Sequence, residues 1–492
     1  MSTTRDRRFY IIGAGFAGIS IAQEIRGKGI FGTVAAFLDD DPAKIGTRID
    51  EVPVLGPIAD VAPLIKKRPT DEALIAIPSA GRDRLRRLHQ ILEQAEFPRI
   101  RILPGLSQIV DGDAHLIQTR ELDPQDLLGR SPIPIGLKES LRYLRGRRVL
   151  VTGAGGSIGS ELCRQLLSGG AQRLFLFGHG ENSIFEIERE LRILQEEGVG
   201  EKAVIVPVMG ELQDRDYMRF ILARLRADVV FHTAAYKHVP MMEANPVGAV
   251  TNNVFGTRNL VEAAREAGTQ RIVFISTDKV AEPMGIYAAT KLLAEQIVRL
   301  ANGNGLGCIA VRFGNVLGSR GSIIPIFQKQ IAKGGPVTIT SPEATRYFMT
   351  SPEAASLVLK AGGVGTAGDL YALDMGEPVL IQDLAEQMVR FYGYEPGKDI
   401  GFQYIGLRPG ERISESLTSP TEAMEPTDFP RIHRIRSAEI DRDALAQTIA
   451  ELERVCFPHP DAPGWYRNRR VLRGILSRYI PQLTIPEHEP EY

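Results

Sequence analysis

Residues 147–167 read RRVLVTGAGGSIGSELCRQLL, an apolar run that predicts a strand, then a glycine-rich turn, then a helix. The turn has the pattern T-G-x-x-G-x-x-G. Glycine lets the backbone approach a pyrophosphate, and the free N–H groups at the start of the helix favour its negative charge. We therefore predict a dinucleotide site in this turn. The residues predicted to hold the cofactor there are Gly153, Gly156, Ser157, Ile158 and Gly159.

Further apolar segments follow this turn at intervals that leave room for a helix between them. They read RLFLFG (173–178), AVIVPVMG (203–210), DVVFHTAA (228–235), RIVFIST (271–277) and CIAVRFGNV (308–316). Alternation of strand and helix is typical of a parallel, doubly wound sheet. We therefore predict an α/β fold of the Rossmann-like type for this part of the chain.

A second glycine-rich turn lies near the N-terminus, in FYIIGAGFAGISIAQEI (9–25). The next predicted strand, TVAAFLDDDP (33–42), ends in three carboxylates, at the position where such folds contact a ribose hydroxyl. A lone G-x-G-x-x-G is a weak signal, and a domain that keeps the fold and binds nothing is the alternative. The residues predicted for an N-terminal nucleotide site are Gly13, Gly15, Gly18 and Asp39.

The chain has 492 residues, which is more than one ordinary core accommodates. The proline- and glycine-bearing stretch 129–147 separates the two glycine-rich turns and is the predicted linker, with the boundary near Arg130. We predict two tandem Rossmann-like, doubly wound parallel sheets. Residues 1–130 form a nucleotide-binding domain, and residues 131–492 form a second domain with a smaller C-terminal substrate-binding part.

The amino-acid composition argues against several classes of protein. The 59 basic and 60 acidic residues nearly cancel, which gives no sign of a nucleic-acid-binding protein. The three cysteines lie far apart, so we expect a reducing compartment and no metal site. No apolar run is long enough to cross a bilayer. We expect a cytoplasmic protein, or one at the cytoplasmic face of the membrane if the sequence is part of a longer membrane form.

Ligands in doubly wound sheets bind beyond the carboxyl ends of the strands. After one predicted strand, the small residues Ala234 and Ala235 leave room for a flat cofactor, and Lys237 and His238 face the substrate side. These two residues fit a solvated loop nearly as well.

Two asparagines are also candidates. Asn252 begins a predicted helix near the nicotinamide ribose, although asparagine is equally a good helix cap. Asn315 ends another strand, where it could hold a substrate phosphate or a sugar hydroxyl, or stabilise a turn.

The stretch STDKVAEPMGIYAATK (276–291) holds the predicted chemistry. Tyr287 and Lys291 lie four residues apart, on one face of a helix. The charge of Lys291 is expected to lower the phenol pKa, which makes Tyr287 a usable base. Asp278 and Lys279 add an acid and a second base, unless they only pair with each other. The predicted catalytic residues are Thr277, Asp278, Lys279, Tyr287 and Lys291.

Several segments together resemble the extended short-chain dehydrogenases that act as UDP-N-acetylglucosamine 4,6-dehydratases. The similarity is to the polysaccharide-biosynthesis type, which has an additional N-terminal nucleotide-fold domain, and it runs from Phe9 to about Leu417. Besides the T-G-x-x-G-x-x-G turn and the STDK…Y…K stretch, the matching segments are AAYKHVPMME (234–243), RFGNVLGSRGS (312–322), TRYFMTSPEA (345–354) and LRPGER (407–412).

This resemblance implies tightly bound, recycled NAD or NADP, a UDP-sugar substrate and a homo-oligomer. It implies that Tyr287, helped by Lys291, removes the C4 hydroxyl proton as hydride leaves C4. Lys279 then takes the C5 proton, Asp278 protonates the departing C6 hydroxyl, and hydride returns to C6. The product is a UDP-4-keto-6-deoxy sugar for surface-glycan synthesis. A UDP-sugar C4 epimerase, which would not need Asp278 and Lys279, and a non-catalytic nucleotide-sugar-binding regulator are the alternatives.

The resemblance also implies contacts to the UDP part of the substrate. Arg346 and Arg408 match its diphosphate- and uridine-side positions, because a guanidinium fork fits phosphate oxygens, although either could form a surface ion pair instead. The residues predicted to bind substrate are Lys237, His238, Asn315, Arg346, Arg408 and Glu411.

Three features depart from the family pattern. Large members commonly carry Met where Tyr287 stands, so inversion and retention at C5 are both open. Gly178 stands where an acidic residue often holds the adenosine ribose, and no basic cluster for a 2′-phosphate is evident, so NAD and NADP are both open. Large members usually begin with membrane-spanning helices, and none is present in this sequence.

Overall fold

The computed structural model describes residues 7–28, 32–60, 65, 68–77, 80–103, 120–121, 141–200, 202–483, 485–486 and 489. The chain divides into two compact units, residues 1–136 and residues 137–492. The boundary predicted near Arg130 lies outside the described residues.

The first unit is built on a sheet with the strand order β3-β4-β2-β1-β5-β6-β7. Its inner strands β4, β2, β1, β5 and β6 run parallel, and β3 and β7 pair antiparallel at the edges. Apolar residues of β1, β2 and helix α1 form its core, as expected for a covered parallel sheet. The elements are β1 (Arg8–Ile12), α1 (Phe16–Lys28), β2 (Thr33–Leu38), β3 (Arg48–Ile49), β4 (Val52–Leu55), a 3-10 turn (Ile58–Asp60), β5 (Glu72–Ile75), α3 (Arg82–Gln94), β6 (Ile100–Ile102) and β7 (Arg120–Glu121).

The second unit contains a larger sheet with the order β10-β9-β8-β11-β12-β13-β18-β22-β21. The strands from β10 to β18 are parallel, and β22 and β21 continue the sheet antiparallel. The chain order reverses at β8, which lies between β9 and β11, and such a switch point is where ligands bind. The strands are β8 (Arg148–Thr152), β9 (Arg173–Gly178), β10 (Val204–Met209), β11 (Val229–His232), β12 (Arg271–Ile275), β13 (Gly307–Arg312), β18 (Leu370–Leu373), β21 (Ala423–Pro426) and β22 (Ile432–Arg436).

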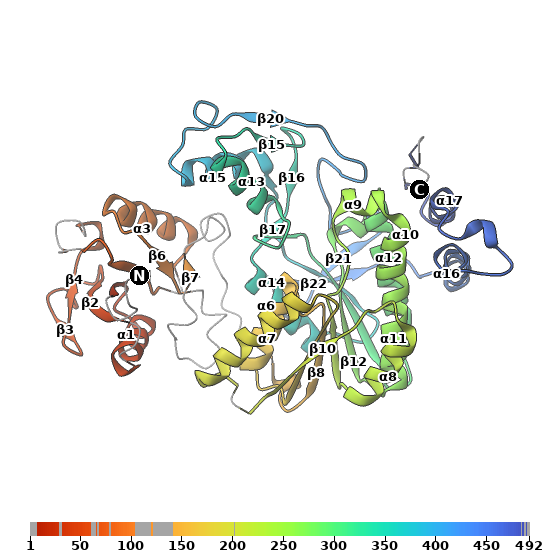
Figure 1. The fold of residues 1–492 in the computed structure, drawn as a ribbon, viewed down its shortest axis with the longest axis horizontal. Helices are drawn as coiled ribbons and strands as arrows, with labels where there is room; N and C mark the ends of the chain where they lie inside the picture. The colour runs from red at the N-terminus through yellow and green to blue at the C-terminus, as the bar shows by residue number, and fades with distance from the viewer. Residues whose placement is uncertain are drawn as a thin grey trace. The chain divides into compact units, whose positions relative to one another are not determined.

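Helices cover both faces of this sheet, which confirms the predicted doubly wound α/β fold. Figure 1 shows α6, α7 and α14 on one side of the strands and α8, α11 and α12 on the other. The helices are α6 (Ser157–Ser168), α7 (Glu181–Glu196), α8 (Arg215–Leu225), α9 (Val239–Ala244), α10 (Pro246–Val250), α11 (Gly256–Glu266), α12 (Ile286–Leu300) and α14 (Ser351–Val364), besides a 3-10 turn at Arg142–Leu144.

Short elements form a smaller part of this unit, at the top of Figure 1. Three two-stranded pairs occur here, namely β14 with β17, β15 with β20 and β16 with β19. The elements are β14 (Asn315–Val316), α13 (Ile323–Ala332), β15 (Val337–Ile339), β16 (Thr345–Arg346), β17 (Phe348–Met349), β19 (Val379–Leu380), α15 (Ile381–Phe391) and β20 (Phe402–Tyr404).

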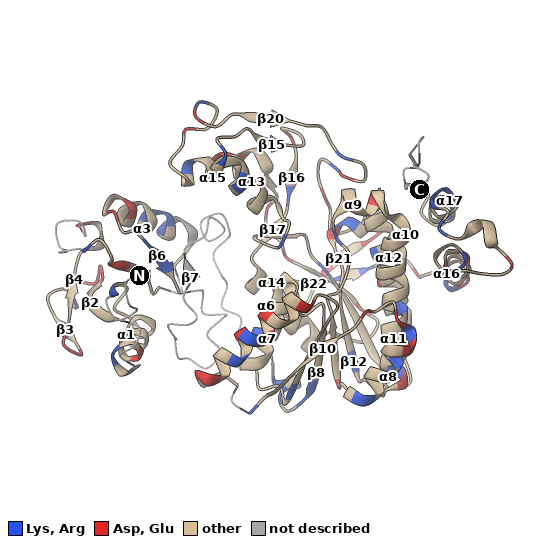
Figure 2. Ribbon diagram, viewed as in Figure 1, with Lys and Arg blue, Asp and Glu red and all other residues tan. Residues whose placement is uncertain are grey.

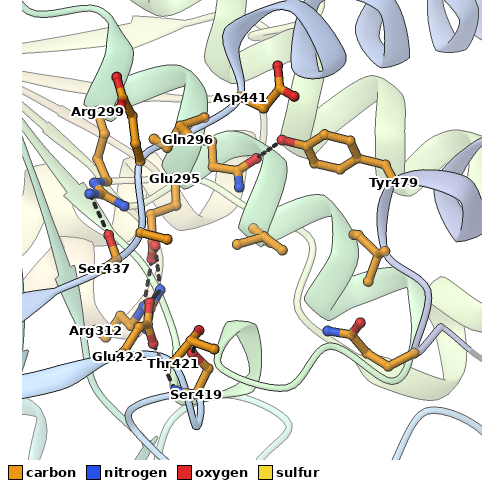
Figure 3. Close-up of a pocket in the computed structure, with 16 residues that line it drawn as sticks. Glu295, Gln296, Arg299, Arg312, Ser419, Thr421, Glu422, Ser437, Asp441 and Tyr479 are labelled. Atoms are coloured by element: carbon orange, nitrogen blue, oxygen red, sulfur yellow. Dashed lines mark hydrogen bonds and ion pairs between the residues drawn. The ribbon is translucent and has the colours of Figure 1, made fainter.

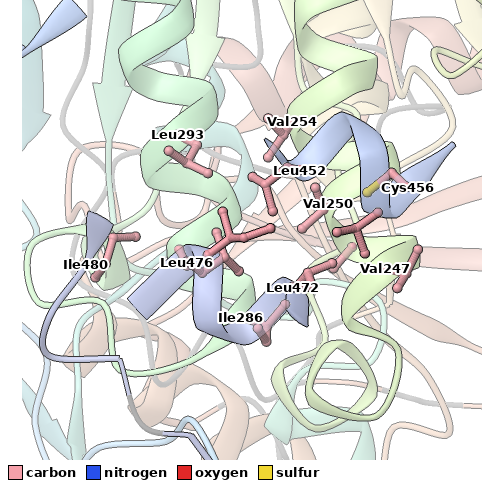
Figure 4. Close-up of a cluster of buried hydrophobic side chains, with 14 of the residues drawn as sticks. Val247, Val250, Val254, Ile286, Leu293, Leu452, Cys456, Leu472, Leu476 and Ile480 are labelled. Carbon is pink, nitrogen blue, oxygen red and sulfur yellow. The ribbon is translucent and has the colours of Figure 1, made fainter. Parts of the chain in front are cut away.

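Two C-terminal helices, α16 (Arg442–Cys456) and α17 (Arg469–Tyr479), follow the sheet, with a 3-10 turn (Pro463–Trp465) between them. They pack on α10 and α12 through one apolar cluster (Figure 4). From α16 and α17 come Leu452, Cys456, Leu472 and Leu476, and from the helices beneath come Val247, Val250, Val254, Ile286 and Leu293. The start of α12 is therefore held by the C-terminal helices.

Charges of both signs are interspersed on the surface, for example along α7 and α11 (Figure 2). Among the described residues, no helix has the length and apolar character needed to cross a membrane. Within the same ranges, no group of three or more His, Cys, Asp or Glu side chains is placed to hold a metal ion.

Candidate active site

The glycine-rich turn of the second unit joins β8 to α6, as predicted. Gly153 has φ +69°, and a Cβ on it would lie 2.8 Å from the Cα of Ala234, so a larger residue fits neither the conformation nor the space. A Cβ on Gly159 would overlap the carbonyl oxygen of Gly153. Gly156 is the N-cap of α6 and provides no capping side chain. The first N–H groups of α6 are therefore suited to bind a phosphate.

Two predicted residues beside this turn have defined contacts. Ser157 Oγ accepts a hydrogen bond from the N–H of Arg320 at 3.0 Å. Ala234 N–H is 3.4 Å from the hydroxyl of Thr152, at the end of the neighbouring strand. The turn and the end of β11 thus meet at the switch point, where a dinucleotide binds in this class of fold.

Two asparagines lie in a π-helical turn, Thr251–Phe255, and both are buried. Asn253 holds the backbone of Tyr236, accepting from its N–H at 2.8 Å and donating to its carbonyl at 3.0 Å. Asn252 donates to Asn253 Oδ1 at 3.0 Å. The contacts that order the strand end belong to Asn253, and a contact of Asn252 with the cofactor stays a prediction. A π-turn changes which residues face inward, and helical periodicity does not predict this.

Asp278 and Lys279 follow β12 in a short 3-10 turn, Asp278–Val280. Asp278 Oδ1 accepts from the Thr277 hydroxyl and from Lys279 Nζ, each at 3.0 Å. Asp278 Oδ2 is buried and has no hydrogen-bond partner among the described residues. Lys279 Nζ also donates to Asn315 Oδ1 at 3.2 Å, so three predicted residues meet at one point.

Tyr287 lies in the first turn of α12, buried near this group. Burial raises the pKa of Tyr287, and the charge of Lys279 and a hydrogen bond with Thr277 oppose that rise. The expectation that Lys291 lowers the phenol pKa is therefore corrected. The pKa is raised overall, and Lys279 gives the largest lowering contribution.

Lys291 lies one turn further along α12 and is fully enclosed. Its Nζ donates to the carbonyl of Ile275 at 2.6 Å and lies 3.9 Å from the centre of the Phe274 ring. Burial lowers the pKa of Lys291 to about 7, although Glu295 opposes the shift. The Tyr–Lys pair is thus present on one face of α12, as predicted.

Glu415 is part of the site, and the sequence analysis missed it. Its Oε1 lies 3.7 Å from Lys279 Nζ and 4.0 Å from Arg346 Nε, and its side chain is 5% exposed. The segment LRPGER pointed instead to Glu411, four residues earlier. We call Asp278, Lys279, Tyr287 and Glu415 the acid–base group.

Two predicted substrate residues, Lys237 and His238, lie beside the loop after β14. Lys237 Nζ is 3.4 Å from Ser319 Oγ, and burial lowers its pKa. The ring of His238 packs on Gly321, where a Cβ would overlap it. Burial, followed by the charge of Lys237, lowers the pKa of His238. Lys237 and His238 are both exposed, and their contacts with a substrate stay a prediction.

The other predicted substrate residues make contacts within the protein. Arg346 donates to the carbonyls of Thr345, Arg412 and Ile413, at 2.7, 2.7 and 2.8 Å. The Nε of Arg408 donates to Glu411 Oε1 at 3.0 Å. Arg346 thus fixes the segment that precedes Glu415. Contacts of these residues with a nucleotide stay a prediction.

The N-terminal turn has the predicted form. Gly13 has φ +104°, and a Cβ on it would lie 2.7 Å from Ile77 Cγ1. A Cβ on Gly18 would overlap the Gly13 carbonyl oxygen, whereas one on Gly15 would meet nothing within 4 Å. The carboxylate of Asp39 accepts from Ala14 N–H at 2.7 Å, so it closes the turn from β2.

The same carboxylate also accepts from the N–H of Asp41 at 2.9 Å and lies 3.5 Å from Lys44 Nζ. Burial opposes ionisation of Asp39, but these N–H groups and Lys44 outweigh it and lower the pKa. The structure therefore shows a structural role for Asp39, and its contact with a ribose stays a prediction.

A pocket of about 280 Å³ is lined by α12 and by segments near the C-terminus, and no residue of the acid–base group lines it. Figure 3 shows Arg312 between Glu295 and Glu422 in its wall. Arg312 Nη2 is 2.7 Å from Glu295 Oε1, and Glu295 Oε2 accepts from the Ser276 hydroxyl at 2.6 Å. This buried ion cluster links α12 to the end of β12.

The fold and the site together define an extended short-chain dehydrogenase, with a glycine-rich turn at the switch point and a Tyr–Lys pair after β12. The chain belongs to the polysaccharide biosynthesis protein family, which matches residues 149–437.

Individual relatives agree with this assignment. The chain is 41% identical over 446 residues to the probable polysaccharide biosynthesis protein EpsC of Bacillus subtilis (strain 168), covering 90% of this chain and 74% of that protein. The X-ray structure of Pen from Bacillus thuringiensis is 31% identical, with a TM-score of 0.54, covering 60% of this chain and 89% of that one.

Relatives that are named for an activity are more distant. The chain is 28% identical over 296 residues to the UDP-N-acetylglucosamine 4,6-dehydratase (inverting) of Campylobacter jejuni subsp. jejuni, covering 59% of this chain and 83% of that protein. It is 29% identical over 301 residues to the UDP-glucose 4-epimerase of Rickettsia canadensis, covering 59% and 82%. The chain therefore belongs to an enzyme family of nucleotide-sugar dehydratases and epimerases.

Proposed function

We propose that this protein is a UDP-N-acetylglucosamine 4,6-dehydratase that makes a UDP-4-keto-6-deoxy sugar for surface-glycan synthesis. The observation that carries the proposal is the contact between Asp278 and Lys279 beside Tyr287, at the end of β12. Moving hydride at C4 requires one proton relay. Loss of water across C5–C6 requires a second acid and base. The site has both sets of residues.

The glycine-rich turn fits a nicotinamide dinucleotide, because Gly153 and Gly159 have no room for a Cβ and α6 begins without a capping side chain. When bound, NAD or NADP would supply the hydride acceptor and donor that the reaction needs. The residues that would hold it are Gly153, Gly156, Ser157, Ile158, Gly159, Ala234, Ala235, Asn252 and Lys291.

The protein side chains handle the protons. Tyr287 takes the proton of the C4 hydroxyl, and the resulting 4-ketone makes C5–H acidic. Lys279 takes the C5 proton, while Asp278 gives a proton to the C6 hydroxyl, which leaves as water. The buried Oδ2 of Asp278 supports this role, because it has no hydrogen-bond partner among the described residues and is free to contact a substrate hydroxyl.

Lys279→Ala tests the assignment of the second base. We expect C4 oxidation to persist, seen as the absorbance of reduced cofactor, while loss of water slows by roughly 100-fold or more, as for a removed general base. Lys398→Ala is the control, because Lys398 is an exposed lysine paired with Glu395 at 2.8 Å. Elimination near the wild-type rate in Lys279→Ala would refute this role of Lys279.

The second candidate function is a UDP-sugar C4 epimerase, which the similarity to named epimerases favours. The two reactions differ in their products, since an epimerase retains the C6 oxygen. Recovery of a C4 epimer with no 4-keto-6-deoxy sugar would decide for the epimerase.

We also propose a nucleotide or UDP-sugar site in the first unit. The open space at Gly15 supports it. No protein atom would collide with a Cβ at this position, so the fold itself does not require glycine there, whereas a ligand that approaches the backbone closely would require it. The homo-oligomer expected from the family resemblance stays a prediction.

A further inference from the structure

Glu415 belongs to the acid–base group, but no step described above uses it. Its carboxylate lies 3.7 Å from Lys279 Nζ. Lys279 Nζ is also within 3.0 Å of Asp278 Oδ1 and 3.2 Å of Asn315 Oδ1. The ammonium group is therefore surrounded by three oxygen acceptors from three different segments.

The placement of Glu415 is well supported. Arg346 holds the carbonyls of Arg412 and Ile413, and the side chain of Arg412 pairs with Glu282. These contacts fix the segment just before Glu415, so that its side chain reaches the site with only 5% exposure. Burying a carboxylate this close to a lysine costs free energy unless the two groups form an ion pair or a proton passes from the lysine to the carboxylate.

The proposed reaction sets a requirement for Lys279. An amine takes a proton from C5 only when it is neutral, because the ammonium form has no lone pair. Burial opposes the ammonium form, but Asp278 and Glu415 outweigh burial and raise the pKa of Lys279. Lys279 must therefore give its proton to a neighbour before it acts as a base.

We propose that Glu415 is a fourth proton-transferring residue of this site, which takes a proton from Lys279 Nζ before the C5–H bond is broken. This inference rests on the proposed dehydratase function. One N–H bond of Lys279 breaks and one O–H bond forms on Glu415, which leaves Lys279 neutral. Lys279 then takes the C5 proton, exchanges it with solvent and later returns a proton to C5. Glu415 finally gives its proton back, so the pair ends as it began.

The charges around Glu415 agree with a proton-carrying role. Burial, followed by the charge of Asp278, raises its pKa, while Lys279, Arg346 and Arg412 lower it. The net direction is upward, so Glu415 accepts a proton more readily than an exposed glutamate. The titratable or charged groups that face the Glu415–Lys279 pair are Asp278, Tyr287, Arg346 and Arg412.

The first test follows the titration of Lys279 by NMR in the full-length protein with labelled lysine, and Lys279→Arg assigns the signal. Glu415→Gln removes the charge and keeps the shape. We expect the Lys279 titration midpoint to move to lower pH in this variant. Glu395→Gln, which neutralises the partner of the exposed Lys398, should leave the Lys279 midpoint unchanged. An unchanged midpoint in Glu415→Gln would overturn the pairing.

The second test measures exchange of C5–H with deuterium from solvent in the presence of UDP-N-acetylglucosamine. We expect Glu415→Gln to bind cofactor and form reduced cofactor, while C5 exchange slows by roughly 10- to 100-fold, because the group that receives the Lys279 proton is lost even though the Lys279 midpoint falls. Glu415→Asp should recover part of the rate, because it restores a carboxyl. C5 exchange at the wild-type rate in Glu415→Gln would overturn the proposal.

The two tests separate this inference from the proposed function. If the wild-type protein makes no 4-keto-6-deoxy sugar, the proposed function fails, and the NMR titration alone decides whether Glu415 controls the proton of Lys279. If the wild-type protein makes the product and Glu415→Gln changes neither measurement, only the role of Glu415 fails.

Discussion

The glycines of the two glycine-rich turns are required at their positions for different reasons. Gly13 and Gly153 have positive φ angles and touch neighbouring backbone or side chains. Gly18 packs α1 against the turn, with no space for a Cβ. Gly15 is exposed, and a Cβ on it would meet no protein atom. Substitution at Gly15 and at Gly18 therefore separates ligand binding from folding.

We expect Gly15→Ala to fold normally, with a change in the free energy of unfolding below about 1 kcal/mol. Gly18→Ala should lose roughly 1–3 kcal/mol, because its Cβ overlaps the Gly13 carbonyl. Hydrogen exchange of residues 9–25, measured in the full chain with a panel of nucleotides and UDP-sugars, reads out binding. Ligand protection in wild type that persists fully in Gly15→Ala would contradict a close approach at Gly15.

Lys291 gives a prediction about pH. Its pKa falls from 10.5 in a model peptide to about 7 in the folded protein, mainly through burial. Between these two values the unfolded chain binds more protons than the folded chain, so the free energy of unfolding rises with pH. This contribution is complete above pH 10.5 and is lost as the pH falls to about 7.

Denaturant unfolding of wild type and Lys291→Met at several pH values checks this. We expect the stability difference between the two proteins to change in favour of wild type as the pH rises through that window. Lys329→Met, at an exposed lysine of α13, is the matched control and should show no such trend. A pH-independent difference for Lys291→Met would mean that Lys291 titrates normally.

At the scale of elements, the start of α12 is held by Glu243 of α9, which forms a buried ion pair with Arg473 of the C-terminal helix α17. Glu243 Oε1 accepts from the N–H of Ile286 at 2.6 Å, one residue before Tyr287. Arg473 of α17 donates to Glu243 Oε2 at 2.9 Å and to its carbonyl at 2.8 Å, and Arg473 is 1% exposed. Glu243 thus caps α12 while Arg473 neutralises its charge.

Arg473→Met should destabilise the protein by about 3–5 kcal/mol, because it leaves a buried carboxylate without its partner. It should also lower kcat, because Glu243 orders the residue next to Tyr287. Arg478→Met is the control on the same helix, since Arg478 is exposed and pairs with Glu451. We expect that control to change the free energy of unfolding by less than about 1 kcal/mol. Chemical denaturation and steady-state kinetics measure both effects. Equal effects of the two variants would contradict the role of the Arg473–Glu243 pair in holding the start of α12.

At the scale of the whole molecule, the sequence was sufficient for features that depend on local pattern. The alternation of strands and helices, both glycine-rich turns and the Tyr–Lys pair follow from apolar runs and fixed spacings of a few residues. These features could be predicted because the backbone geometry of a turn or helix is decided by near neighbours.

Features that depend on distant segments could not be predicted in this way. Glu415 reaches Lys279 from a segment far along the chain, and Arg473 reaches Glu243 from the last helix. No helical or strand periodicity in the sequence relates residues that lie so far apart along the chain. The π-turn that buries Asn253 also breaks helical spacing. For Arg346 and Arg408 the sequence left a phosphate contact and an ion pair open, and the folded chain gives both of them partners within the protein.

NMR of the purified protein with UDP-N-acetylglucosamine in D₂O tests the central claim most directly. The proposed mechanism predicts a 4-keto-6-deoxy product with deuterium at C5, because Lys279 exchanges the C5 proton before hydride returns to C6. The couplings of the product then give the configuration at C5. Recovered substrate mixed only with its C4 epimer would contradict the claim, because Asp278 and Lys279 would then have no second proton transfer to perform.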